Sequence, residues 1–197
     1  MEVKINPLAY VKVYEHAKMF ARDDRFIYGL LTGYVEDDKS YPQDYIPLSH
    51  CYGEPIDFEL KHEIFGQIES FNTQHYDPQY IYDQIVGWVR SCPIGNIEPN
   101  STDRNNHMYI QTAYCEQAVA LFIPPTGDQY EMSLKRLKGE LPEIDQNSLF
   151  EEVDWNFGEI EDLDNLFHTI IHLQRKRKKK APLLEEVFEE PIAGAPE

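Results

Sequence analysis

The sequence predicts a mixed α/β (α+β) fold, with one β-sheet flanked by helices, and three observations support this prediction. The chain of 197 residues contains 42% hydrophobic and 13% aromatic residues, enough to form the core of one domain of average size. The first segment has the apolar spacing of a helix. Short β-rich apolar segments then alternate with further helical segments, as expected for a single mixed domain.

The first expected elements are a helix and two strands. Pro7 suits the first turn of a helix, and Asn6 before it suits the N-cap position. The segment 27–35 is short, apolar and β-rich, which predicts a buried strand, and the acidic residues after it predict a turn. Another strand is expected at 45–48, where Pro47 requires an edge or a bulge because it lacks a backbone N–H.

The later elements are assigned on the same grounds of spacing, capping and β-propensity. Pro124 and Pro125 end the expected strand at 118–123, and the basic run at 175–180 follows the last expected helix. Helices are expected at 58–71, from Asn100 or Ser101 to about Tyr114, and from about Asp162 onward, and strands are expected at 85–89, 118–123 and 129–137.

Composition excludes several classes of function. The net charge of −17 argues against a surface coated for nucleic acid, because phosphate binding needs a positive face. No apolar run approaches the roughly 20 residues that span a bilayer, and the N-terminal residues lack the layout of a signal peptide. The 3 cysteines are an odd number at irregular spacings, which argues against a disulfide framework. We therefore expect a soluble, cytoplasmic protein without membrane contact.

The charge is unevenly distributed and suggests how the chain is divided. Residues 175–180 hold 6 of the 18 basic residues, whereas residues 1–174 hold 12 basic and 30 acidic residues, a net charge of −18. The run Arg175–Lys180 is interpreted as the cationic end of a helix, with a nuclear-import or anion-binding signal as the alternative. We predict a domain over 1–145, a helical extension over 146–180 and a disordered acidic tail over 181–197.

Several segments resemble those of one known domain family. The segments 7–35, 46–50, 85–88 and 118–125 are similar to the MPN domain, also called the JAB or JAMM domain, and the resemblance covers roughly residues 5–137. Its most specific part is Gly87-Trp88-Val89-Arg90-Ser91-Cys92-Pro93, followed by Asp103. Catalytic members have Gly-Trp-x-His-Ser-His-Pro and then Ser-x-x-Asp, whose histidines and aspartate bind zinc while a glutamate on the first strand polarises the zinc-bound water. That arrangement hydrolyses isopeptide bonds, typically between ubiquitin-like proteins and lysine side chains.

Residue by residue, this chain departs from the catalytic pattern. Arg90 and Cys92 occupy the two histidine positions, and Asn100 occupies the serine position. Phe26 stands at the glutamate position, and only Asp103 matches. An arginine cannot ligate zinc because its guanidinium stays protonated, and a catalytic zinc needs three protein ligands. The resemblance therefore implies a degenerate member without catalytic residues and without a cofactor.

Two arrangements of these residues are open. Our hypothesis is that Arg90 and Asp103 form an ion pair where active relatives hold the metal, because a buried unpaired carboxylate costs several kcal/mol. The rival is a remodelled metal site of Cys92, Asp103 and His107, since residues four apart share one face of a helix. The positive charge of Arg90 would repel a dication there, so we favour the ion pair.

Three further histidines and two further cysteines are interpreted as structural. His168 and His172 have i, i+4 spacing but lack the glutamate of the metalloprotease motif, so we expect them to flank the apolar stripe of the last helix. His50 and Cys51 follow a strand and are assigned to a loop or to packing, and Cys115 is expected to be a small buried hydrophobe.

The expected function is that of a non-catalytic scaffold or partner-binding subunit. Degenerate members of the family commonly pair with another MPN subunit in assemblies such as the proteasome lid, the COP9 signalosome or translation initiation factor 3. The resemblance thus implies a second MPN-type chain, or a second copy, as the partner. The alternatives are a metal-dependent isopeptidase or peptidase with a displaced site, and a protein that binds a ubiquitin-like partner without cleaving it, since an acidic body would complement a basic-rimmed partner.

Overall fold

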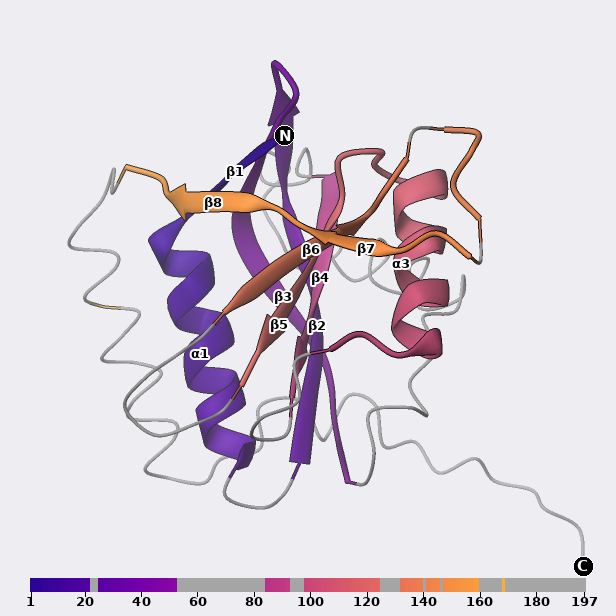
Figure 1. Cartoon of the computed structure of the whole chain (residues 1–197). Coiled ribbons are helices and arrows are strands. Elements are labelled where there is room, and N and C mark those ends of the chain that lie inside the picture. Colours follow the sequence, from indigo (N-terminus) through magenta and orange to yellow (C-terminus); the bar gives the residue numbers. More distant parts are fainter. Residues whose placement is uncertain are drawn as a thin grey trace, which may run out of the picture.

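A mixed eight-stranded sheet forms the centre of the computed structural model (Figure 1), in the order β7-β6-β5-β4-β2-β3-β1-β8. The structure describes residues 1–21, 25–52, 84–92, 98–124, 132–139, 141–145, 147–159 and 168. Its elements are β1 (Glu2–Ile5), α1 (Pro7–Ala21), β2 (Arg25–Glu36), β3 (Lys39–Tyr52), β4 (Gln84–Ser91), α3 (Ser101–Ala113), β5 (Val119–Ile123), β6 (Ser133–Leu137), β7 (Phe150–Glu152) and β8 (Asp154–Phe157).

The sheet curves until its two edges meet. β7 and β8 stand at opposite ends of the strand order, yet only Val153 separates them along the chain. Consecutive Cα atoms lie about 3.8 Å apart, so the two edges approach within about 8 Å at this residue. The Val153 N–H donates to the Leu134 carbonyl of β6 at 2.9 Å, and the Gly158 N–H donates to the Ile5 carbonyl of β1 at 2.9 Å. In Figure 1 the orange segment accordingly runs from β6 across to β1.

The helices α1 and α3 cover opposite faces of the sheet (Figure 1). Trp88 of β4 pairs with Leu30 of β2 and its indole donates a hydrogen bond to α3. Tyr45 of β3 pairs with Leu31, the next residue of β2, and its hydroxyl hydrogen-bonds to α1. Successive residues of a strand point to opposite faces, so the two contacts lie on opposite sides of the sheet.

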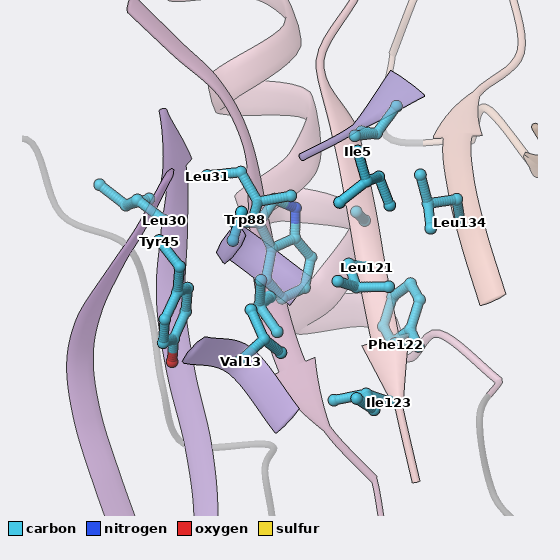
Figure 2. Close-up of a cluster of buried hydrophobic side chains, with 14 of the residues drawn as sticks. Ile5, Val13, Leu30, Leu31, Tyr45, Trp88, Leu121, Phe122, Ile123 and Leu134 are labelled. Atoms are coloured by element: carbon cyan, nitrogen blue, oxygen red, sulfur yellow. The ribbon is translucent and has the colours of Figure 1, made fainter. Parts of the chain in front are cut away.

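The core is filled from both ends of the chain. Figure 2 shows Ile5 of β1, Leu121 of β5 and Leu134 of β6 in one cluster of buried side chains, and each of these residues is at most 1% exposed. Val3 and Ile5 alternate with half-buried neighbours on β1, the pattern of a strand with one buried face. Curvature of the sheet places the N-terminal strand against residues more than a hundred positions away in sequence.

Most of the predicted elements are confirmed where the structure describes them. The helix begins at Pro7, and the Asn6 side chain accepts a hydrogen bond from the Leu8 N–H at 2.8 Å, as an N-cap does. Pro47 lies at a bulge of the β2–β3 pairing, where the register shifts between Tyr28 and Gly29. Strands at 84–91, 119–123 and 133–137 and the helix 101–113 match their predicted positions within a few residues. The helices predicted at 58–71 and from 162 onward fall outside the described residues, apart from His168.

The predicted helical extension over 146–180 is wrong in its first part. Residues 150–157 form the strands β7 and β8, which belong to the central sheet. Acidic residues are frequent in this segment, a composition with low strand propensity, and hydrogen bonds to β6 and β1 determine its conformation instead. β1 was also not predicted, because four residues are too few for a periodicity. The expected tail over 181–197 lies outside the described residues.

The Tyr45 ring lies directly over Gly29 of β2. A Cβ atom at Gly29 would overlap this ring and would also lie 2.6 Å from the Ile46 carbonyl oxygen. Tyr45 cannot move away freely, because it is 4% exposed and its hydroxyl lies 2.7 Å from His16 Nδ1 on α1. Glycine at position 29 therefore allows α1, β3 and β2 to approach one another.

We predict that Gly29→Ala lowers the free energy of unfolding by about 1–3 kcal/mol, the usual cost of overpacking a core. Urea titration followed by circular dichroism measures the change. Gly158→Ala is the matched control, because its new Cβ would meet only the Ile5 carbonyl oxygen at 3.7 Å. Equal stability of the two variants would contradict the assigned role of Gly29.

Candidate functional site

The residues of the degenerate motif meet between β4 and the first turn of α3. Arg90 NH2 lies 2.7 Å from Asp103 Oδ2, and the two side chains are only 3% and 1% exposed. The predicted ion pair is therefore present. It joins the end of a central strand to the start of a helix on one face of the sheet.

The same carboxylate also caps α3. Asn100 Oδ1 accepts a hydrogen bond from the Asp103 N–H, and Asp103 Oδ2 accepts one from the Asn100 N–H, both at 2.8 Å. This reciprocal arrangement is a capping box, which satisfies two backbone donors at the N-terminus of a helix. Asn100 is thus the N-cap, one of the two candidates, Asn100 and Ser101, that the sequence left open. The capping role of Asp103 was missed, although the spacing Asn-x-x-Asp is the signal that could have revealed it.

The Arg90 guanidinium is enclosed by an aromatic ring and a loop carbonyl. Its Cζ lies 5.0 Å from the centroid of the Phe122 ring, a favourable cation–π distance. Its NH2 group also lies 3.5 Å from the Glu98 carbonyl oxygen. Arg90 Nε and Asp103 Oδ1 each lack a hydrogen-bond partner within the described structure. Part of the free-energy cost of removing the two charges from water is therefore not offset by hydrogen bonds.

Burial affects the charge of Asp103, and one further buried cation, Lys135, lies beside Glu98. Burial raises the pKa of Asp103, and the Arg90 guanidinium and the Asn100 N–H oppose that rise. Lys135 of β6 is 9% exposed and lies 2.9 Å from Glu152 and 3.6 Å from Glu98. Burial lowers the pKa of Lys135, but the two carboxylates outweigh it and raise this pKa overall. Sequence inspection did not indicate Lys135, because its partners come from a loop and from a strand that was not predicted.

Cys92 is a protonated thiol in this environment. It is fully buried, and burial raises the pKa of its thiol to about 11 despite the opposing effect of Arg90. Its Sγ lies 4.0 Å from the Arg90 carbonyl oxygen, and its backbone N–H donates to the Ile123 carbonyl. A thiol must ionise before it can attack a substrate. Cys92 is therefore unsuited to act as a nucleophile at neutral pH.

His107 faces the sheet one turn beyond Asp103, but it has a different partner. Its Nδ1 accepts a hydrogen bond from Trp88 Nε1–H at 3.1 Å, and its ring lies 5.4 Å from that of Phe150. The side chain is fully buried, and burial, aided by the charge of Arg136, lowers its pKa to about 3. His107 is thus neutral at physiological pH. This buried hydrogen bond was not predicted from the sequence.

The described residues do not fit the zinc ion that the family resemblance implies. Arg90 has no lone pair to donate, and Asp103 is engaged by the arginine and by the helix N-terminus. Within the described ranges, no three His, Cys, Asp or Glu side chains are close enough together to hold a metal. Phe26 is half-buried on β2, two residues before the Tyr28–Arg90 pair. Its phenyl ring has no group that could polarise a water.

Other residues singled out by sequence lie away from this site. Cys115 is buried after α3, as expected for a small hydrophobe. His168 is helical and exposed. His172 and the basic run over 175–180 fall outside the described residues, and His50 and Cys51 lie on β3.

Comparisons with known proteins show a distant similarity. No protein-family model matches the chain. The chain is 24% identical over 200 residues to the H subunit of eukaryotic translation initiation factor 3 from Xenopus tropicalis, and 25% identical over 200 residues to the protein of the same name from Xenopus laevis. Each alignment covers 94% of this chain but 57% of the relative. The chain thus spans little more than half the length of the curated relatives that it matches.

Of the helices that the structure describes, neither α1 nor α3 has both the length and the apolar character needed to cross a membrane.

We predict that the effects of removing the Arg90 and Asp103 charges are not additive, because either single change leaves one buried charge without its partner. Arg90→Met leaves a buried carboxylate and Asp103→Asn leaves a buried guanidinium, and each should cost about 3–5 kcal/mol. The double variant Arg90→Met/Asp103→Asn should cost clearly less than the sum of the two. Urea unfolding of all four proteins measures the coupling, and additive effects would contradict it.

We also predict that acid weakens the fold through His107. Its pKa is about 3 in the folded chain and about 6.5 when unfolded, so only the unfolded state gains this proton as the pH falls below about 6.5. Stability should then decrease by about 1.4 kcal/mol per pH unit from this residue. His107→Asn keeps an acceptor for Trp88 but does not titrate.

Urea unfolding of the wild-type chain and of His107→Asn between about pH 7 and pH 4 isolates this contribution, because all other titratable groups are the same in the two proteins. The stability of the wild-type chain should fall more steeply than that of His107→Asn over this interval. Parallel curves would show that His107 gains its proton as readily in the folded chain as in the unfolded chain, which would contradict the lowered pKa.

Proposed function

We propose that this chain is a non-catalytic, MPN-type scaffold that binds a protein partner within a larger assembly. The described structure is a mixed sheet with helices on both faces, which is compatible with this fold. The two relatives carry the name of a component of translation initiation factor 3, one of the assemblies that the sequence resemblance suggested. A cytoplasmic location belongs to the same proposal.

The buried Arg90–Asp103 pair is the observation that carries the proposal. At the positions that the resemblance assigns to zinc ligands, the chain has an arginine and a protonated thiol. The remaining carboxylate is used to hold α3 against β4. These three side chains are thus committed to stabilising the fold. They offer neither an activated water nor a nucleophile for hydrolysis.

The partner that this proposal favours is a second MPN-type chain. A protein that no longer catalyses is retained in an assembly for the surfaces it presents. The alignments cover only 57% of each relative, so the activity and contacts of the whole relatives carry over only as part of this proposal.

We predict that the affinity-tagged full chain, purified from its native cells at physiological salt, brings down a second MPN-type protein in stoichiometric amount. Mass spectrometry identifies the partner, and sizing of the purified complex with multi-angle light scattering gives its composition. A chain recovered alone, at the mass of a monomer, would contradict the scaffold proposal.

The full chain, expressed and purified without its partner, tests the enzymatic alternative. With zinc added, it should leave a ubiquitin-like conjugate uncleaved, because the site residues do not fit the metal. Chelator-sensitive turnover by this isolated chain would replace the scaffold proposal with an isopeptidase that uses a displaced site.

A further inference from the structure

The short strand β8 presents an unused hydrogen-bonding edge within the described part of the chain. It pairs with β1 on one side in a parallel ladder, and it stands at the end of the strand order. The Gly158 N–H donates to the Ile5 carbonyl. Backbone groups alternate in direction along a strand, so Gly158, Asn156 and Asp154 direct theirs towards β1. Trp155 and Phe157 lie between these positions. Their N–H and C=O groups therefore point to the outer edge.

An aromatic cluster lies beside this edge. We call it the β8 aromatic cluster and define it as Tyr10, Tyr14, Trp155 and Phe157. The Phe157 ring lies 5.1 Å from that of Tyr10 and 5.4 Å from that of Trp155, both in edge-to-face contact. Phe157 is 48% exposed. In Figure 1 this strand lies next to the first turns of α1, from which the two tyrosines come.

The other face of the same strand is acidic and polar. Asp154 and Asn156 are exposed and alternate with the aromatic residues along β8. Glu151 and Glu159, also exposed, flank the strand. An edge of this kind combines outward backbone groups, aromatic rings on one face and negative charge on the other.

We propose that β8 accepts an extended segment of a partner protein that alternates apolar and basic residues. The segment would add a strand to the sheet, using the backbone groups of Trp155 and Phe157. Its apolar side chains would extend the β8 aromatic cluster, and its Lys or Arg side chains would lie along the face of Asp154. The inference rests on the proposed function in one respect, that the chain binds a protein.

Charge argues for such a partner rather than for a second copy of this chain. Pairing two β8 strands would bring Asp154, Glu151 and Glu159 of one chain beside the same residues of the other. Each chain also carries a net charge of −17. Like charges that face one another across a strand pair are destabilising, whereas a basic segment turns the same charges into attraction.

The test uses a synthetic peptide of about eight residues, the length of an ordinary strand, that alternates Val and Lys. We expect it to shift the backbone amide signals of Trp155 and Phe157 in the isotope-labelled full chain and to slow their hydrogen exchange. A peptide that alternates Val and Glu should not bind. The same Val–Lys peptide with methylated backbone nitrogens keeps its charge but cannot form the ladder, so it should lose binding.

Variants of the chain locate the site. Phe157→Ala should weaken binding of the Val–Lys peptide about fivefold or more, as expected for a central aromatic contact. Leu149→Ala is the matched control, because Leu149 is 68% exposed and lies outside β8. It should leave the affinity unchanged.

Several results would overturn the inference. Equal binding of the methylated peptide would show that ionic attraction, and not strand addition, holds the peptide. Sedimentation of the chain alone as a dimer that Phe157→Ala dissociates would make a second copy the occupant. Absence of any peptide binding, with co-purification of a partner intact in Phe157→Ala, would remove the β8 site and leave the scaffold proposal standing.

Discussion

The buried ion pair between Arg90 and Asp103 is the interaction on which the arrangement around β4 and α3 depends. Two charges that are almost fully removed from water are tolerated only if each has a partner and further hydrogen bonds. Here one carboxylate neutralises the arginine and closes the N-terminal turn of α3 at the same time. Position and orientation of the helix are therefore coupled to a charge on the central strand.

The groups around this pair are held in uncharged or compensated states. Cys92 stays a thiol and His107 stays a neutral imidazole, because burial disfavours the ionised form of each. Lys135 keeps its charge through two exposed carboxylates at the rim. A metal site differs because several donor atoms are directed at one shared point. The positions that hold a metal in catalytic members of the resembled family here connect a strand, a helix and a neighbouring strand.

The parts of the fold with a strong local signal were predictable from the sequence. Pro7 after Asn6 indicated a helix start, and Asn100 indicated a cap, because both effects act within one turn. The ion pair between Arg90 and Asp103 could be predicted from the sequence, because a buried carboxylate needs a partner of opposite charge. The Trp88–His107 hydrogen bond could not, since it depends on how α3 is rotated over the sheet. β7 and β8 could not either, because strands so rich in acidic residues are specified by neighbouring strands that are distant in sequence.

Closure of the sheet through Val153 has a consequence for where this fold can be cut. The segment from Phe150 to Phe157 protects two edges at once, β6 on one side and β1 on the other. A chain shortened to the boundary predicted at residue 145 would uncover both edges together, and open strand edges pair readily with those of other molecules. A truncation that keeps both edges covered therefore has to extend through Gly158, whose hydrogen bond to Ile5 ties the last strand to the first.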